Sequence, residues 1–127
     1  MSIARIIGAL SRAERRKVGA LIVKDQNIIG MGFNGTPSGM NNACEDENGA
    51  TKAEVLHAEA NAIMKVAAST LSTKGATLYV TVSPCIHCAK LIVQSGIVQV
   101  YFAEKYKCSQ GINLLQNMGV SVLDKHS

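Results

Sequence analysis

The sequence contains no tryptophan, and aromatic residues make up only 4% of its 127 residues. Proteins that bind single-stranded nucleic acid stack bases on aromatic side chains, so we expect no nucleic-acid partner. Nor does the chain contain an apolar run long enough to span a membrane, and its first residues lack the pattern of a cleaved signal. These absences favour a cytoplasmic protein without a membrane partner.

Cysteine is also scarce, because four cysteines are too few for a disulfide framework in a chain of this length. In a reducing cytosol a disulfide between Cys85 and Cys88 is not expected either. A hydrophobic fraction of 47% predicts one globular domain spanning residues 1–127. The net charge of +4 favours an anionic partner without identifying it.

Hydrophobic periodicity predicts a helix over residues 3–13, with Ile3, Ile6, Ile7 and Leu10 on one side. It further predicts strands over 18–23, 28–33, 75–82, 97–103 and 120–123, and helices over 57–68, 85–95 and 109–117. In the second helix the residues expected to point inward are Ala60, Ile63, Met64 and Ala67. In the third they are Ile86, Ala89, Leu91 and Ile92. This order predicts an α/β fold, a three-layer α/β/α domain around a mixed five-stranded sheet. Active sites in such sheets gather where strand ends meet helix starts.

Two short motifs lie at such places, a His-x-Glu at residues 57–59 and a Pro-Cys-x-x-Cys at residues 84–88. Cys85 and Cys88 are three residues apart, so on a helix both point to one side. Pro84 suits a helix start, where a missing N–H costs nothing. Thiols near a helix N-terminus have a lowered pKa, which favours metal binding.

His57 would supply a third ligand, and three protein ligands leave a tetrahedral zinc ion one open position for water, as in catalytic sites. Glu59 would then act as the proton carrier rather than as a ligand. Residues 51–54 read as a capping box, but in one continuous helix His57 and Glu59 would point in nearly opposite directions. We therefore predict that the helix begins near His57 and that residues 51–56 form a turn or an extended segment.

A structural zinc site is the first alternative, closed by a fourth ligand from Cys44, His87, Cys108 or His126. A non-catalytic zinc-binding interaction module is the second. Neither explains a glutamate two residues after the histidine, and Glu59 is intact.

The amino-acid sequences of four segments resemble those of a known family: residues 14–20, 33–39, 57–63 and 83–90. His-x-Glu with Pro-Cys-x-x-Cys is the signature of zinc-dependent nucleobase deaminases. The chain resembles the cytidine-deaminase-fold enzymes, and among them the deoxycytidylate (dCMP) deaminases, over nearly its whole length. Adenosine deaminases that act on tRNA share the zinc motifs and remain an alternative, although the loop Asn34–Gly39 argues against them.

The resemblance implies a zinc-dependent hydrolysis of dCMP to dUMP and ammonia. Zinc would be held by His57, Cys85 and Cys88, with Glu59 as the catalytic residue. It further implies a substrate site in which Asn34 holds the deoxyribose, the Ala58 backbone contacts the pyrimidine edge, and Tyr106 lies near the phosphate, with Ser83 beside them. Relatives with a second, structural zinc use a cysteine where this chain has Ala13, and a lone Cys44 holds no structural zinc. One zinc ion per chain is therefore expected.

The family also implies regulation, because its members are commonly hexamers activated by dCTP and inhibited by dTTP near the Asn34–Gly39 loop. A bound triphosphate can bring Mg²⁺ with it. The basic residues Arg12, Arg15, Arg16 and Lys17 precede the first strand of the hairpin, and this loop follows the second. Antiparallel pairing brings the two together. The residues expected at the effector site are Arg15, Lys17, Asn34, Gly35 and Asn41; the alternative is a solvated basic turn.

Overall fold

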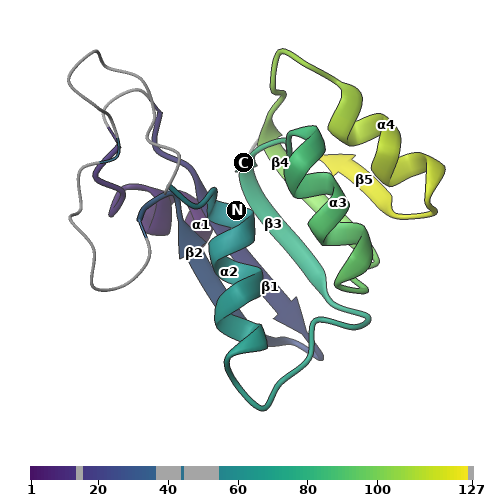
Figure 1. The fold of residues 1–127 in the computed structure, drawn as a ribbon, viewed down its shortest axis with the longest axis horizontal. Helices are drawn as coiled ribbons and strands as arrows, with labels where there is room; N and C mark the ends of the chain where they lie inside the picture. Colours follow the sequence, from purple (N-terminus) through teal and green to yellow (C-terminus); the bar gives the residue numbers. More distant parts are fainter. Residues whose placement is uncertain (14–15, 37–43, 45–54, 126–127) are drawn as a thin grey trace.

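The computed structural model describes residues 1–13, 16–36, 44 and 55–125 (Figure 1). Strands β1 (Gly19–Lys24) and β2 (Asn27–Phe33) form the predicted antiparallel hairpin, with Gly19 opposite Phe33. The turn between them places Asp25 and Gln26 at φ of 52° and 67°. Positive φ at both central residues matches the right-handed twist of a hairpin.

The hairpin continues into a mixed five-stranded sheet of order β2-β1-β3-β4-β5. Strand β3 (Thr77–Val82) runs antiparallel to β1, whereas β4 (Gln99–Glu104) and β5 (Ser121–Asp124) run parallel to β3. Parallel neighbours require crossover connections, and helices α3 (Ile86–Gln94) and α4 (Gln110–Asn117) supply them. The predicted α/β architecture is therefore confirmed.

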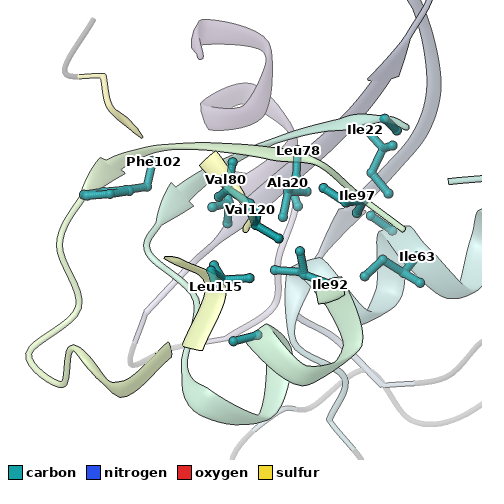
Figure 2. Packing of buried hydrophobic residues seen from close by; sticks show 14 of the residues in the cluster. Ala20, Ile22, Ile63, Leu78, Val80, Ile92, Ile97, Phe102, Leu115 and Val120 are labelled. Carbon is teal, nitrogen blue, oxygen red and sulfur yellow. The ribbon is translucent and has the colours of Figure 1, made fainter. Parts of the chain in front are cut away.

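Alternating side chains of β1 separate two layers of packing. Ala20 and Ile22 join the main core beneath α2 (Ala58–Ala67), α3 and α4, which lie on one face of the sheet (Figure 1). Figure 2 shows this core, in which aliphatic side chains of the sheet meet Ile63, Ile92 and Leu115 of the three helices. Leu21 points to the opposite face and packs with Ala4 and Ile7 of helix α1 (Ser2–Gly8). None of the helices in the described ranges has the length and apolarity that crossing a bilayer requires.

Helix α1 ends at Gly8, so the predicted helix over residues 3–13 was too long. The chain turns after Gly8 because Ser11 is bound elsewhere: its hydroxyl donates to the carbonyl oxygen of Asn34 at 2.6 Å and accepts from the Ala13 N–H at 3.1 Å. Of the predicted apolar side only Ile7 is buried, whereas Ile3, Ile6 and Leu10 are exposed.

The inward faces predicted for α2 and α3 were partly wrong. Met64 and Ala67 of α2 are exposed, and the buried stripe runs through Ala62 and Val66. In α3, Leu91 is exposed, whereas Cys88, Ala89 and Ile92 are buried. In both helices the first turn sets the rotation, because it must direct Glu59 or Cys88 inward.

Helix α2 sits unusually close to β2 because Gly32 has no side chain. A Cβ atom at Gly32 would lie 2.5 Å from the Ala58 carbonyl oxygen and 2.6 Å from the Ala62 nitrogen. Both contacts are to backbone, which cannot rotate away. The glycine therefore fixes how deeply the N-terminal turn of α2 lies against the sheet.

We predict that Gly32→Ala lowers the free energy of unfolding by about 1–3 kcal/mol, the usual cost of overpacking a tight site. Urea unfolding followed by circular dichroism measures it. Gly35→Ala is the matched control, because a Cβ there would lie 3.7 Å from its nearest neighbour, a carbon of Phe33. Equal midpoints for the two variants would contradict the close-approach explanation.

Candidate active site

His57 lies just outside α2, as its N-cap residue, with extended backbone (φ −67°, ψ 157°). The preceding residue, Leu56, forms an isolated bridge to Gly35, with N–O distances of 2.7 and 3.0 Å. This bridge ties the segment before α2 to the end of the hairpin and keeps it out of the helix. The prediction that the helix begins near His57 is confirmed, whereas residues 51–54 lie outside the described residues.

Cys85 occupies the corresponding place in α3, as an N-cap residue with φ −74° and ψ 172°. Strand β3 delivers it through Ser83 and Pro84, both of which are buried. Cys88 follows in the first turn of α3 and is buried. Each helix thus presents potential ligands at its first turn, at neighbouring places on one face of the sheet.

The three candidate ligands converge. The Nδ1 atom of His57 lies 3.3 Å from the Cys88 sulfur and 3.5 Å from the Cys85 sulfur, and all three ligand atoms lie within 4.8 Å of one another. Tetrahedral zinc, with bonds of about 2.3 Å to sulfur and about 2.0–2.1 Å to nitrogen, separates its ligand atoms by about 3.5–3.8 Å. The observed spacing therefore fits a zinc ion.

The pKa values of the Cys85 and Cys88 thiols are shifted in opposite directions. A hydrogen bond from the Cys88 thiol lowers the pKa of Cys85 to about 3. The same interaction, together with burial, raises the pKa of Cys88 well above its usual value. Hydrogen bonding to Cys85 raises the pKa of His57. One negative charge is thus stabilised on the sulfur pair, and a divalent cation would deprotonate the second thiol as well.

Glu59 is only 5% exposed, beside the three ligands. Burial raises the pKa of its carboxyl group to about 7, against the lowering effect of a backbone hydrogen bond and of the charge on His57. A carboxyl group with such a pKa can both accept and donate a proton near neutral pH. The location suits the proton carrier predicted from the sequence.

Among the described residues, His57, Cys85 and Cys88 form a group that could hold a metal ion. Of the residues considered as a fourth ligand, His87 and Cys108 are exposed, and His126 lies outside the described residues. Cys44 is buried and lines the cavity beside the ligands, as does Ala13. A group of three ligands with an adjoining cavity is the arrangement of an open, catalytic zinc site.

The cavity has a volume of about 490 Å³, within the usual range of small-molecule sites. It extends from the metal ligands toward the ends of β2, β3 and β4. Its lining includes every residue that the resemblance placed in the substrate site, and two cations that were not placed there: Asn34, Ala58, Ser83, Tyr106, Arg16 and Lys107.

Asn34 uses its amide group to hold the backbone. Its Nδ2 donates to the Arg16 carbonyl oxygen at 2.8 Å, and its Oδ1 accepts from the Val18 N–H at 2.9 Å. Asn34 thereby binds the segment before β1 to the end of β2. The sequence indicated a polar loop here but could not reveal these two hydrogen bonds to the backbone of Arg16 and Val18.

Ser83 likewise supports the chain around it. Its hydroxyl accepts a hydrogen bond from the Tyr106 N–H at 2.7 Å, and its own N–H donates to the Glu104 carbonyl oxygen at 2.8 Å. These bonds hold the segment after β4 against the start of α3, so that Tyr106 and Lys107 line the cavity. Ala58 is fully buried, and its N–H belongs to the first turn, where an α-helix leaves such groups without helical partners.

Of the residues expected at the effector site, the structure describes Lys17, Asn34 and Gly35, and Lys17 and Asn34 line different cavities. Lys17 is exposed and lines a different cavity, of about 330 Å³, together with Arg5. Gly35 is held by its bridge to Leu56, and Asn34 lines the catalytic cavity. Arg15 and Asn41 lie outside the described residues.

Comparison with known proteins gives the family. Residues 1–104 match the family model described as the cytidine and deoxycytidylate deaminase zinc-binding region. The deoxycytidylate deaminase of Mycobacterium phage D29 is 37% identical over 119 residues, which cover 83% of this chain and 91% of the phage protein. Human deoxycytidylate deaminase is 37% identical over 130 residues, covering 93% and 72% of the two chains.

A solved structure is similar over the same range. The dCMP deaminase of cyanophage S-TIM5, crystallised in complex with dCMP and dUMP, has a TM-score of 0.95 and 44% sequence identity, with 98% of this chain and 92% of that chain covered. The residues matched by the family model, 1–104, include both helix starts that carry the three ligands. This chain belongs to the family of zinc-binding cytidine and deoxycytidylate deaminases.

Proposed function

We propose that the protein hydrolyses dCMP to dUMP and ammonia, with zinc as its cofactor. The observation that carries the proposal is the convergence of His57, Cys85 and Cys88 near a buried Glu59, beside a cavity of about 490 Å³. The similarity to dCMP deaminases supports the choice of substrate. Zinc bound by three protein ligands activates a water molecule by lowering its pKa to about 7.

The residues of the chain then move the protons. Glu59 accepts a proton from the water that attacks C4 of cytosine and delivers it to N3. A second proton passes from the new hydroxyl group to the amino group, the C4–N4 bond breaks, and ammonia leaves with the bonding electrons. A carboxyl group with a pKa of about 7 suits both transfers, since neither direction is strongly uphill.

Binding of the nucleotide falls to the other residues that line the cavity. The Ala58 backbone contacts the pyrimidine edge, Asn34 holds the deoxyribose, and Tyr106 lies near the phosphate, with Ser83 supporting that segment. In this arrangement the base lies near Glu59 and the phosphate lies near Tyr106.

Regulation by nucleoside triphosphates is a finer part of the proposal. dCTP would activate and dTTP would inhibit by favouring different states of a homo-oligomer, a hexamer by family resemblance, with Mg²⁺ accompanying the triphosphate. Differential affinity between states is what such regulation requires. The candidate residues are Arg15, Lys17, Asn34, Gly35 and Asn41.

The substrate is tested by comparing turnover of dCMP, dCTP, deoxycytidine and a tRNA anticodon stem. We expect Glu59→Gln to lower dCMP turnover by a factor on the order of 10² or more, because the amide cannot carry the proton. The isosteric variant should keep its fold and its zinc. Asp25→Asn, the same change at the exposed hairpin turn, should retain full activity. Full turnover by the Glu59 variant would remove this residue from the mechanism.

One zinc ion per chain is expected by elemental analysis of the purified protein. Cys85→Ser and Cys88→Ser should each lose it and should lower the thermal midpoint, because metal binding contributes to folding stability. Cys108→Ser is the matched control, since this exposed cysteine lies outside the group of ligands and should keep the metal. Two tightly held zinc ions per chain would contradict the single-site assignment.

Effector control predicts that, at low dCMP, dCTP raises and dTTP lowers the rate. The same assay on Arg15→Ala should show a weaker response to both nucleotides, because a triphosphate needs guanidinium partners. Light scattering in parallel reports the oligomer. A parent enzyme that ignores both nucleotides would disprove the regulation while leaving the deaminase activity intact.

A further inference from the structure

Strand β2 is an edge strand of the sheet, so the backbone groups on its outer side have no neighbouring strand to bind. At the end of β2 the start of α2 takes that place. The side-chain Nδ2 of Asn61 donates to the carbonyl oxygen of Phe33 at 3.0 Å. Two residues further on, Gly35 forms its bridge with Leu56, just before the helix. The start of α2 is therefore attached to the hairpin at two successive points.

The peptide group between Phe33 and Asn34 is held from both sides. Its N–H, which belongs to Asn34, donates toward β1, to the carbonyl oxygen of Val18 at 3.3 Å. In a planar trans peptide the carbonyl group points the opposite way. The Phe33 oxygen therefore points away from β1 and toward α2, where Asn61 binds it. Asn61 thus connects α2 to the same peptide group that begins Asn34, the residue expected at the sugar.

Asn61 also closes the first turn of α2. Its backbone N–H donates to the carbonyl oxygen of His57 at 2.9 Å. Glu59 lies midway between these two residues in the sequence. The turn that carries a potential metal ligand and the proton carrier therefore ends on a residue whose side chain is bound to β2. A displacement of Asn61 would move His57 and Glu59 together.

The residue type at position 61 is unfavourable for its place in a helix. Asparagine is a poor helix former because its amide competes with the backbone for hydrogen bonds, whereas its neighbours Ala60 and Ala62 are the best helix formers. Here the amide binds another element instead. Lys65, one turn later, also contacts Phe33, with its Nζ 5.7 Å from the centre of the ring, but this lysine is exposed and such contacts are weak at exposed sites. The partly buried hydrogen bond of Asn61 is the stronger link.

We propose that Asn61 is a positioning residue for the metal centre. Its side-chain amide fixes the first turn of α2 against the peptide group between Phe33 and Asn34, and this sets the places of His57 and Glu59. The structure describes Asn61 outside the lining of the catalytic cavity, so it acts through these neighbours and not on the substrate. The inference deepens the proposed function and rests on it for the zinc ion and for the role of Glu59.

Two variants, Asn61→Ala and Asn61→Leu, remove the donor to the Phe33 oxygen; both new residues are good helix formers, and they differ in bulk. We expect each variant to raise the zinc dissociation constant, measured by chelator competition, by about tenfold or more, the usual effect of losing a group that supports a metal ligand. With zinc saturating, kcat for dCMP should fall by about tenfold or more, because the proton carrier is displaced. KM should change little, since the Asn34 amide keeps its bonds to Arg16 and Val18.

Thr73→Val is the matched control. The Thr73 hydroxyl donates to the carbonyl oxygen of Ser95 at 2.6 Å, a partly buried bond of the same kind between the segment after α2 and the C-cap of α3. This bond lies at the opposite end of α3 from Cys85. The control variant should lower the midpoint of urea unfolding and leave the zinc dissociation constant and kcat unchanged.

If both Asn61 variants match Thr73→Val in zinc affinity and kcat, Asn61 serves stability alone, and the proposal is overturned while dCMP deamination stands. An effect confined to one of the two variants would indicate packing rather than the lost donor and would also overturn it, as would a raised KM with an unchanged kcat. If the parent does not deaminate dCMP, the proposed function fails separately, and zinc affinity alone then decides. Tighter zinc binding by the parent than by both variants supports the proposal, and equal binding refutes it.

Discussion

The site depends on the order and direction of the strands, which bring distant segments to one edge of the sheet. The end of β2 lies beside the start of β1, as Phe33 pairs with Gly19. The start of β1 lies beside the end of β3, because those strands are antiparallel, and the end of β4 lies beside the end of β3, because those are parallel. Cys85, Asn34 and Arg16 therefore all lie near this edge of the sheet and line the same cavity.

The N-termini of α2 and α3 lie at this edge and carry the three potential metal ligands. An extended N-cap at His57 and another at Cys85 aim their side chains back along the helix axes, where the first-turn N–H groups favour negative charge. Glu59 can reach the same place as His57 only because His57 is outside the helix. The bridge between Leu56 and Gly35 holds the residue before His57 in an extended conformation, outside the helix.

The grouping of His57, Cys85 and Cys88 could be predicted from the sequence because the information is local: two short motifs, each at a predicted helix start. The end of α1 could not, since it depends on a bond between Ser11 and Asn34, 23 residues apart. The pairing of Arg16 with Glu104 spans 88 residues and has no local signal at all. The rotation of α2 was misjudged because periodicity does not reveal that its first turn must direct the polar Glu59 inward.

In the proposed substrate site, Asn34 would combine two roles, binding the backbone before β1 and contacting the substrate. An asparagine amide has two N–H donors and an oxygen with two lone pairs. Among the described residues, the bonds to Arg16 and Val18 use one donor and one lone pair, which would leave a donor and an acceptor for a sugar hydroxyl at the cavity wall. Because the same amide binds the carbonyl oxygen of Arg16, a sugar contact by Asn34 would be coupled to the position of the Arg16 backbone. An aspartate there would keep the acceptor but lose the donor to the Arg16 carbonyl oxygen, which would loosen the anchor of Arg16 even where a sugar contact survives.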